Sequence, residues 1–140
     1  MQGSTIQRAS KMFGVVFLLV GITGLIPWHD GYYDALFEFG GPGAEQLNFI
    51  GVNILEVVAH LLYGVAGFVM AKTAANARAY FLGGGALYMV LWVYGLLTWD
   101  SNANIIGVNQ AANWVHFALG VVMLGVGLVM GKEAETPAAA

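Results

Sequence analysis

Four long apolar stretches dominate the sequence, and they restrict its possible folds more than any other feature. They cover residues 12–28, 49–71, 79–99 and 109–131. A helix needs about 20 apolar residues to cross the ~30 Å hydrocarbon core of a bilayer, so each stretch can span or nearly span it. Only 9% of the residues are charged, whereas soluble domains carry about 25%. The sequence therefore predicts an all-α integral membrane four-helix bundle over residues 12–131, surrounded by the lipid bilayer.

The basic residues all fall on one side of this four-span arrangement. They are Arg8, Lys11, Lys72, Arg78 and Lys132. The loops 29–48 and 100–108, on the other side, contain no Lys or Arg and hold five acidic residues. Because Lys and Arg concentrate in cytoplasmic loops, this distribution predicts that both termini are cytoplasmic. Residues 1–11 would then form a cytoplasmic N-terminal segment, and residues 132–140 a flexible cytoplasmic tail.

An internal repeat relates the two halves of the chain. The sequence Ile-Gly-Val-Asn occurs at 50–53 and again at 106–109, an offset of 56 residues. The same offset places His60 onto His116. Because both halves begin on the same predicted side of the membrane, they would be parallel repeats related by an axis along the membrane normal. The sequence thus predicts a bundle made of two repeated transmembrane hairpins.

Each copy of this tetrapeptide ends in Asn, which favours the N-cap of a helix. Glu56 follows Asn53 by three residues, the spacing of a capping box. This predicts that Glu56 lies in the first helical turn near the outer interface, where a carboxylate also suits the helix dipole. His60 and His116 each follow the capping Asn by seven residues, about 10 Å along a helix. The two histidines should therefore lie at similar depth in the outer half of the membrane.

These two histidines are the main candidates for a functional site. One interpretation is structural, because polar side chains within a span usually face other helices rather than lipid. His60 and His116 would then be neutral packing residues that hydrogen-bond to Glu56, Asn113 or a backbone carbonyl. A second interpretation is a proton or ion pathway through Glu56, His60 and His116. Against this pathway, the cytoplasmic halves of the spans offer almost no polar residues to continue it.

A third interpretation makes His60 and His116 the axial ligands of a cofactor, either a haem or a chlorophyll-type pigment. Histidine is a standard axial ligand, and equal depth on two repeated helices suits a bis-His site. Gly64 and Gly120, one turn after each His, would leave room for a flat macrocycle. A divalent metal site is less favoured, because Glu56 and the two histidines lack a second carboxylate. The other three interpretations remain open at the level of sequence.

Several classes of activity have no support in the sequence. Cysteine is absent, and the three serines form no Ser/His/Asp arrangement, so no enzyme activity is expected. The glycines at 83–85 are not followed by the Lys and Ser or Thr of a phosphate-binding loop. The net charge is −3 and no basic patch is present, so nucleic acid is not an expected partner.

Four further motifs point together to one family. They are VFLLVGITG at 16–24, HLLYGVAG at 60–67, the stretch 72–95, and Asn-Trp-Val-His at 113–116 with Gly120. Through them, about residues 10–131 resemble the bacterial membrane-protein family called domain of unknown function 4383. The resemblance implies four transmembrane helices in a bacterial cytoplasmic membrane, and it implies no activity. Relatives often carry His-Asn where this chain has Glu56 and Val57.

Three functions agree with these observations. Glycine-rich helix faces and a small soluble surface predict a structural or accessory component of a membrane complex, with other membrane-protein subunits as partners. The first alternative is a cofactor-binding protein with His60 and His116 as ligands. The second is a small proton or ion transporter.

Overall fold

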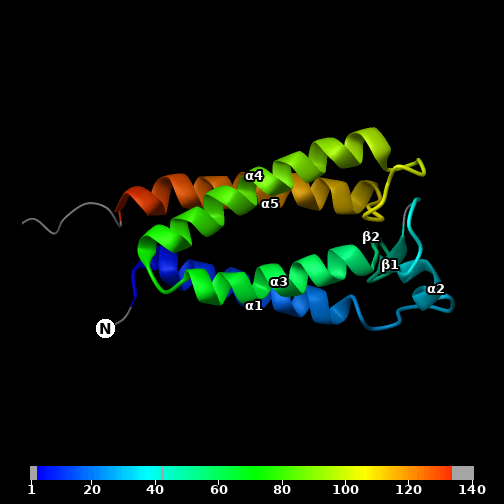
Figure 1. Cartoon of the computed structure of the whole chain (residues 1–140), viewed down its shortest axis with the longest axis horizontal. Coiled ribbons are helices and arrows are strands. Elements are labelled where there is room, and N and C mark those ends of the chain that lie inside the picture. Colours follow the sequence, from blue (N-terminus) through cyan, green and yellow to red (C-terminus); the bar gives the residue numbers. More distant parts are fainter. Residues whose placement is uncertain (1–2, 42, 134–140) are drawn as a thin grey trace, which may run out of the picture.

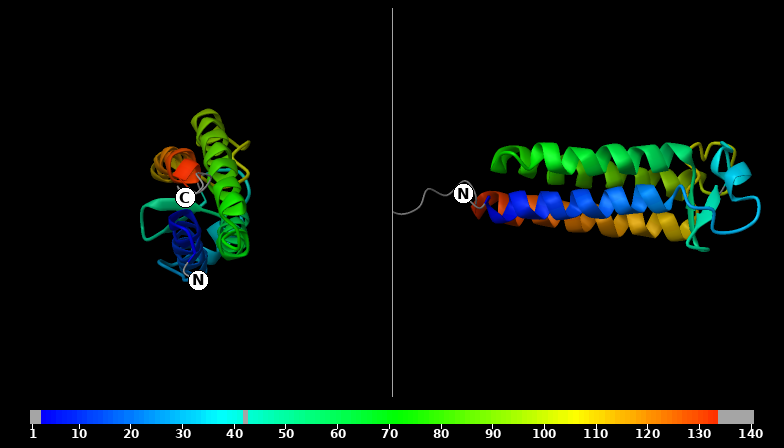
Figure 2. Two further views of the ribbon diagram at one scale, coloured as in Figure 1. Left: turned by 90° about the vertical axis from the view of Figure 1, so that its left-hand side faces the viewer. Right: turned by 90° about the horizontal axis from the view of Figure 1, so that it is seen from below.

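The computed structural model describes residues 3–41 and 43–133. Within them, the elements are α1 (Thr5–Thr23), α2 (Tyr32–Leu36), β1 (Ala44–Gln46), β2 (Ile50–Val52), α3 (Ile54–Met70), α4 (Ala74–Thr98) and α5 (Gln110–Glu133). α1 packs antiparallel against α3, and α4 against α5 (Figure 1). The two helix pairs lie side by side (Figure 2), with sparser contacts between pairs than within each pair. Of the predicted flexible tail, residues 134–140 lie outside the described residues.

Among the described residues, three helices are long and apolar enough to cross a membrane: α1, α4 and α5. α3 is also apolar but shorter, with 17 residues. The outward faces carry large exposed apolar side chains, such as Leu62, which is 67% exposed, and Leu97, which is 77% exposed. Extensive apolar surface of this kind suits contact with lipid. The prediction of a mostly helical membrane protein is confirmed in this coarser form.

Charge distinguishes the two ends of the molecule. The start of α1, the α3–α4 turn and the end of α5 lie at one end, which we call the basic end (Figure 1). It carries Arg8, Lys11, Lys72 and Arg78. The loops 24–53 and 99–109 lie at the opposite end, which we call the acidic end, and they carry five acidic residues. The charge therefore differs between the two ends of the long helices, basic at one end and acidic at the other.

α1 begins before the predicted apolar stretch. The helix starts at Thr5, whereas the predicted stretch starts at Met12. Its first turn is stabilised by Gln7, whose Oε1 accepts a hydrogen bond from the Ser4 N–H at 2.8 Å. Gln7 Nε2 also donates to the carbonyl of Ala71 at 2.9 Å, which ties α1 to the α3–α4 turn. Composition marks only the apolar part of a helix, so the polar first turns were not part of the predicted stretch.

Two other predicted stretches nearly coincide with helices. α4 covers 74–98 against a predicted 79–99, and α5 covers 110–133 against a predicted 109–131. Within the second stretch, predicted over 49–71, α3 begins at Ile54, directly after the Asn53 that the sequence predicts as its N-cap, so residues 49–53 precede the helix.

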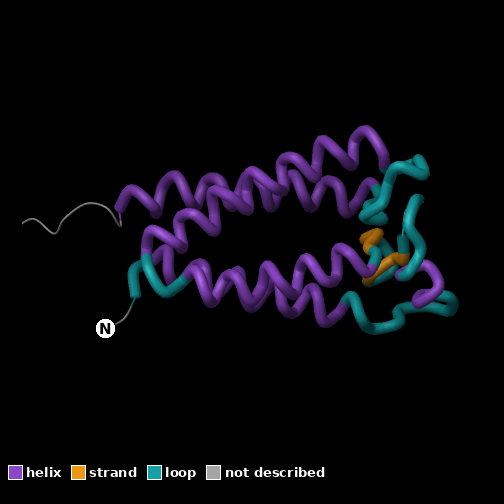
Figure 3. The backbone as a smooth tube through the Cα atoms, in the orientation of Figure 1, coloured by secondary structure: helices purple, strands orange, loops and turns teal. Residues whose placement is uncertain are grey.

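Residues 50–52 form a strand of a small β-hairpin instead. β2 pairs antiparallel with β1 (Figure 3). The turn residues Leu47 and Asn48 have φ values of 54° and 60°, and a type I′ hairpin turn requires positive φ at both positions. β-branched Ile50 and Val52 suit a strand. Asn53 caps α3 in an extended conformation, with φ of −127°, so the helix begins after it.

α2 and the hairpin form a cap over the acidic end with a core of its own. This core contains Tyr32, Leu36, Ala44 and Val52 of the cap, together with Val57 of α3. The Tyr32 hydroxyl donates to the carbonyl of Gly24 at 2.9 Å. Burial raises the pKa of this hydroxyl, with a smaller contribution from neighbouring Tyr33. Tyr32 therefore remains a neutral donor that joins the cap to the end of α1.

Small residues let each helix pair pack closely. A Cβ on Gly67 of α3 would lie 2.7 Å from Cα of Gly14 in α1. The Ser10 hydroxyl of α1 donates to the Gly67 carbonyl at 2.7 Å. In the other pair, a Cβ on Gly85 of α4 would lie 2.8 Å from the backbone nitrogen of Leu124 in α5. Such close backbone approach is typical of helices that associate within membranes.

Candidate functional site

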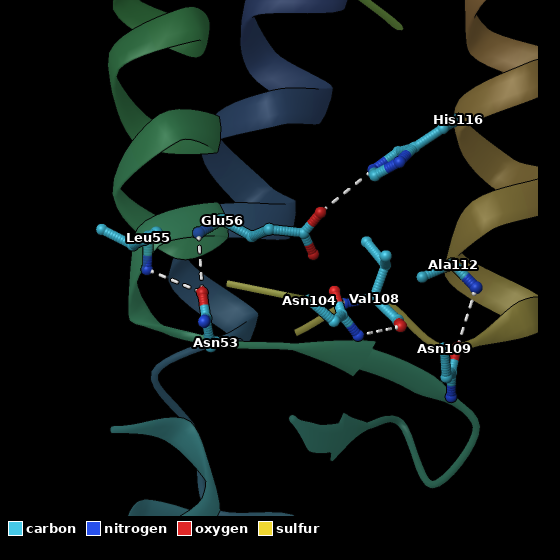
Figure 4. A network of polar contacts seen from close by, with 8 residues as sticks. All are labelled: Asn53, Leu55, Glu56, Asn104, Val108, Asn109, Ala112 and His116. Atoms are coloured by element: carbon cyan, nitrogen blue, oxygen red, sulfur yellow. Dashed lines mark hydrogen bonds and ion pairs between the residues drawn. The ribbon is translucent and has the colours of Figure 1, made fainter. Parts of the chain in front are cut away.

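The site begins with the asparagines that cap α3 and α5. Asn53 Oδ1 accepts hydrogen bonds from the backbone N–H of Leu55 at 3.0 Å and of Glu56 at 3.4 Å. Asn109 Oδ1 accepts one from the N–H of Ala112 at 2.9 Å (Figure 4). Both predicted N-caps are confirmed. The caps fix where each helix starts, and hence the depth of the side chains that follow.

The same asparagines tie the two helix pairs together. Asn53 Nδ2 donates to the Ile105 carbonyl at 2.7 Å, and Asn109 Nδ2 donates to the Phe49 carbonyl at 2.9 Å. Phe49 and Ile105 are 56 residues apart, as are Asn53 and Asn109, so the two bonds are reciprocal. Asn104 is fully buried, and its amide donates to carbonyl oxygens of both acidic-end loops. These bonds fix the position of one helix pair relative to the other at the acidic end.

A buried acid–base pair lies next to this network, further from the acidic end. Glu56 Oε1 of α3 is 3.1 Å from His116 Nε2 of α5 (Figure 4). Glu56 is 6% exposed and His116 is 3% exposed. The sequence predicts a capping-box role for Glu56, but its carboxylate reaches across to α5. Its backbone N–H alone contributes to the cap, by donating to Asn53. A buried carboxylate is costly unless it is paired, which is why this long-range contact replaces the local one.

His60 lies one turn after Glu56 on α3, and its ring has a different environment. It stacks on Phe17 of α1, with the ring centroids 5.8 Å apart and an interplanar angle of 18°. The side chain is half-buried. The ring centroid of Tyr88 in α4 lies 5.3 Å from that of His116. The structure therefore groups His60 and His116 around Glu56, but Glu56 rather than His60 is the bonded partner of His116.

Two cavities adjoin this group of three side chains. The first has a volume of about 260 Å³ and lies mainly between α3 and α4. The second has a volume of about 200 Å³ and lies between α1, β2 and α5. Glu56, His60 and His116 line both cavities, and most other lining residues are apolar. Pockets with apolar walls and a few converging polar groups are typical binding sites for small molecules.

The glycines that were predicted to leave room for a macrocycle do not face these cavities. A Cβ on Gly64 would lie 2.8 Å from the backbone nitrogen of Leu18 in α1. A Cβ on Gly120 would lie 2.7 Å from the sulfur of Met89 in α4. Both glycines therefore serve packing within a helix pair, and that expectation for a bound macrocycle is wrong.

Asn113, the other predicted neighbour of the histidines, also serves packing within a helix pair. It is fully buried on α5. Its amide donates to the carbonyl of Trp92 at 3.0 Å and accepts from the N–H of Leu96 at 3.2 Å, in the orientation that satisfies both ends of the amide. Asn113 thus joins α5 to α4 rather than to His116.

The second ring nitrogen of His116 carries unused hydrogen-bonding capacity. Nε2 contacts Glu56, whereas Nδ1 is buried without a hydrogen-bond partner among the residues that the structure describes. Buried polar atoms in proteins nearly always have a partner. His116 also lines both cavities, so the nitrogen without a partner belongs to a side chain that borders cavity space.

Residues 3–41 and 43–133 contain no group of three or more His, Asp or Glu side chains able to hold a metal ion. The sequence analysis offers Glu56 as one of several partners for the two histidines, but it does not single out the pairing of Glu56 with His116. The repeat contains a signal for it, since it places both caps, and therefore both first turns, at the same end of the molecule.

Comparison with known protein families gives a match over most of the chain. The model of the family Domain of unknown function (DUF4383) matches residues 7–129. No curated protein and no solved structure matches the chain.

Proposed function

Because the chain belongs to the family Domain of unknown function (DUF4383), whose name assigns no activity, we propose its function from the geometry of the site. The protein binds a lipophilic small molecule that carries a hydroxyl or carbonyl group. The molecule lies in the cavities between the helix pairs, and Glu56, His60 and His116 recognise its polar group. The protein acts as a binding protein rather than as an enzyme.

The proposal places all four long helices across a bacterial cytoplasmic membrane, as two repeated hairpins in one bundle. The positive-inside rule assigns the basic end, and therefore both termini, to the cytoplasm. The acidic end, with the cap formed by α2 and the hairpin, faces outward. α3 has 17 residues, which is the lower end of the length that can cross a bilayer.

A single observation carries the choice of ligand: Nδ1 is buried without a partner on His116, a side chain that lines an apolar cavity. If the neutral ring donates from Nε2 to Glu56, Nδ1 is an acceptor and takes a hydroxyl group. If the ring is protonated, Nδ1 is a donor and takes a carbonyl group. Quinols and quinones with apolar tails present these two groups, so they are one suitable class.

The lining residues also support entry of the ligand from the lipid phase. Leu55 and Leu87 line the first cavity and are 43% and 49% exposed. Val16 and Val115 line the second cavity and are 53% and 40% exposed. Since these side chains face both the cavity and the outer surface, each cavity borders the membrane interior.

The alternatives predicted from the sequence have less support. A bis-His haem or pigment needs both imidazoles as ligands, but Glu56 contacts the Nε2 of His116. An ion pathway needs polar groups that continue towards the basic end, where the described core is dominated by apolar side chains such as Phe81 and Met123. The accessory role within a membrane complex stays a prediction. It is compatible with ligand binding.

The direct test is to identify molecules that purify with the protein. The wild type, His116→Phe and Glu56→Gln are purified from native membranes in a mild detergent, extracted with organic solvent and analysed by mass spectrometry. We expect the wild type to be enriched in a lipophilic hydroxyl or carbonyl compound that both variants lose. His29→Ala, at the acidic end, is the matched control and should retain it. Equal extracts from all four proteins would contradict the proposal.

An absorption spectrum separates this function from the cofactor alternative. We expect no Soret or chlorophyll-type band from natively purified protein, in either the oxidised or the reduced state. Such a band, lost in both His60→Ala and His116→Ala, would establish the bis-His site instead.

A further inference from the structure

A groove lies at the basic end, separate from the two cavities of the candidate site. It is an open groove of about 460 Å³ between α1 and α5. Its apolar walls come from Met12 and Phe13 of α1 and from Val126 and Met130 of α5. Arg8 and Thr5 provide its polar part.

Arg8 has spare binding capacity in this groove. Its Nη2 lies 3.5 Å from the Thr5 hydroxyl, which is at the limit of a hydrogen bond. It forms no ion pair with a carboxylate among the residues that the structure describes. A guanidinium carries five N–H donors in a fork that matches phosphate oxygens. Charge complementarity therefore indicates an anionic, phosphate-bearing partner.

The order of residues along α1 matches the order of groups in a phospholipid. Arg8 lies in the first turns of the helix, and Phe13 follows about 7.5 Å further towards the centre of the bundle, at 1.5 Å per residue. Met12 is 68% exposed, so the apolar wall is open to its surroundings. An arginine at the end of a membrane helix lies at the level of the lipid headgroups.

We infer that this groove binds one anionic phospholipid. The lipid phosphate contacts Arg8, and an acyl chain lies along Met12, Phe13, Val126 and Met130. The inference rests on the membrane orientation given under the proposed function. It does not depend on the ligand at Glu56 and His116, so either can fail without the other.

The chain offers a matched control for the charge. Lys11 is on the same helix and is exposed, but it does not line the groove. Arg8→Gln and Lys11→Gln each remove one positive charge from the basic end. A simple effect of net charge would therefore appear equally in both variants.

The experiment measures binding of phosphatidylglycerol to the detergent-purified full chain by native mass spectrometry, with phosphatidylcholine and glycerol 3-phosphate as comparisons. Wild type and Lys11→Gln should bind phosphatidylglycerol in preference to phosphatidylcholine. Arg8→Gln should bind it about tenfold more weakly, since a charge-assisted hydrogen bond is lost. Glycerol 3-phosphate should not bind, because it lacks the acyl chain.

A second variant tests the apolar half of the groove. Val126→Trp fills it from α5 without changing a charge, and it should also weaken phosphatidylglycerol binding. Equal binding by Arg8→Gln and Lys11→Gln would overturn the inference. So would binding of glycerol 3-phosphate alone, which would indicate a free-phosphate site.

Discussion

The two helix pairs are joined by reciprocal asparagine bonds at the acidic end, and they differ in the side chain three residues after each of these asparagines. α3 and α5 each begin with a capping asparagine, and each asparagine donates to a carbonyl in the segment that precedes the other helix. The donors and the acceptors of these bonds are both related by the 56-residue offset. The two bonds are therefore reciprocal.

The difference between the pairs lies three residues after each cap. α3 has Glu56 at this position, whereas α5 has Ala112. Glu56 contacts His116 of the other pair, whereas the equivalent histidine, His60, stacks on Phe17. Two equivalent histidines thus differ in their partners because one carboxylate is present in only one half. The chemistry of the site comes from this difference.

The largest expected effect concerns what the pairs share, close packing through glycine. Gly67→Ala and Gly85→Ala would each bring a methyl group within 2.8 Å of backbone atoms in the partner helix. Each should lower the free energy of unfolding by about 3 kcal/mol, as overpacking does. Unfolding in mixed dodecyl sulfate micelles measures this change.

Gly83→Ala is the control for these variants, because nothing lies within 4 Å of a Cβ at that position. It should leave stability unchanged or raise it slightly, since Ala favours a helix over Gly. If only one of the two Gly→Ala variants is destabilised, the two helix pairs are packed differently. The similarity between the pairs is then limited to the asparagine bonds at the acidic end.

The next effect tests the difference between the pairs. Glu56→Ala leaves His116 buried without its partner and should lower the free energy of unfolding by about 2 kcal/mol. His60→Ala should cost about 1 kcal/mol, because it removes a half-buried ring stacked on Phe17 but breaks no ion pair among the residues that the structure describes. Equal losses in the two variants would mean that the pairing of Glu56 with His116 adds nothing to stability.

The sequence predicts those parts of the two helix pairs that depend on local sequence signals. Long apolar stretches indicate the helices, and Asn at each repeat predicts both caps. Local signals fail where distant contacts decide. The tetrapeptide Ile-Gly-Val-Asn forms strand β2 at 50–52, whereas at 106–108 it forms no strand and Gly107 has a φ of 72°. The local spacing of Glu56 predicts a capping box, but burial opposite His116 favours the long-range pair.

The two capping asparagines allow a finer test of the reciprocal bonds. Asn53 is fully buried and Asn109 is half-buried. Asn53→Ala should lower the free energy of unfolding by about 1.5 kcal/mol, and Asn109→Ala by about 1 kcal/mol, which is within the range for loss of an N-cap. Chemical denaturation of the purified variants measures both losses. A larger loss at Asn109 would contradict this order and show that the acidic end is anchored mainly at α5.

The smallest effect, and the sharpest test of equivalence, comes from moving the carboxylate from one half to the other. In the double variant Glu56→Ala with Ala112→Glu, the acid stands on α5 and His60 on α3 takes the role of His116. Ala112 is buried and lines the second cavity together with His60, so the longer side chain has space. The double variant should recover about 1 kcal/mol of the stability that Glu56→Ala loses, since a new hydrogen-bonded pair replaces the old one.

Position 111 provides the control for this transfer. Ala111 is next in sequence but exposed, so Ala111→Glu in the Glu56→Ala background adds the same charge near the same helix N-terminus without reaching His60. It should gain only the few tenths of a kcal/mol that an acid near a helix N-terminus gives. Equal recovery by both double variants would mean that the helix dipole alone explains the gain. Recovery only by the variant with Glu at position 112 would mean that either half of the chain can supply the carboxylate. The different partners of His60 and His116 would then follow only from the position of this carboxylate on α3.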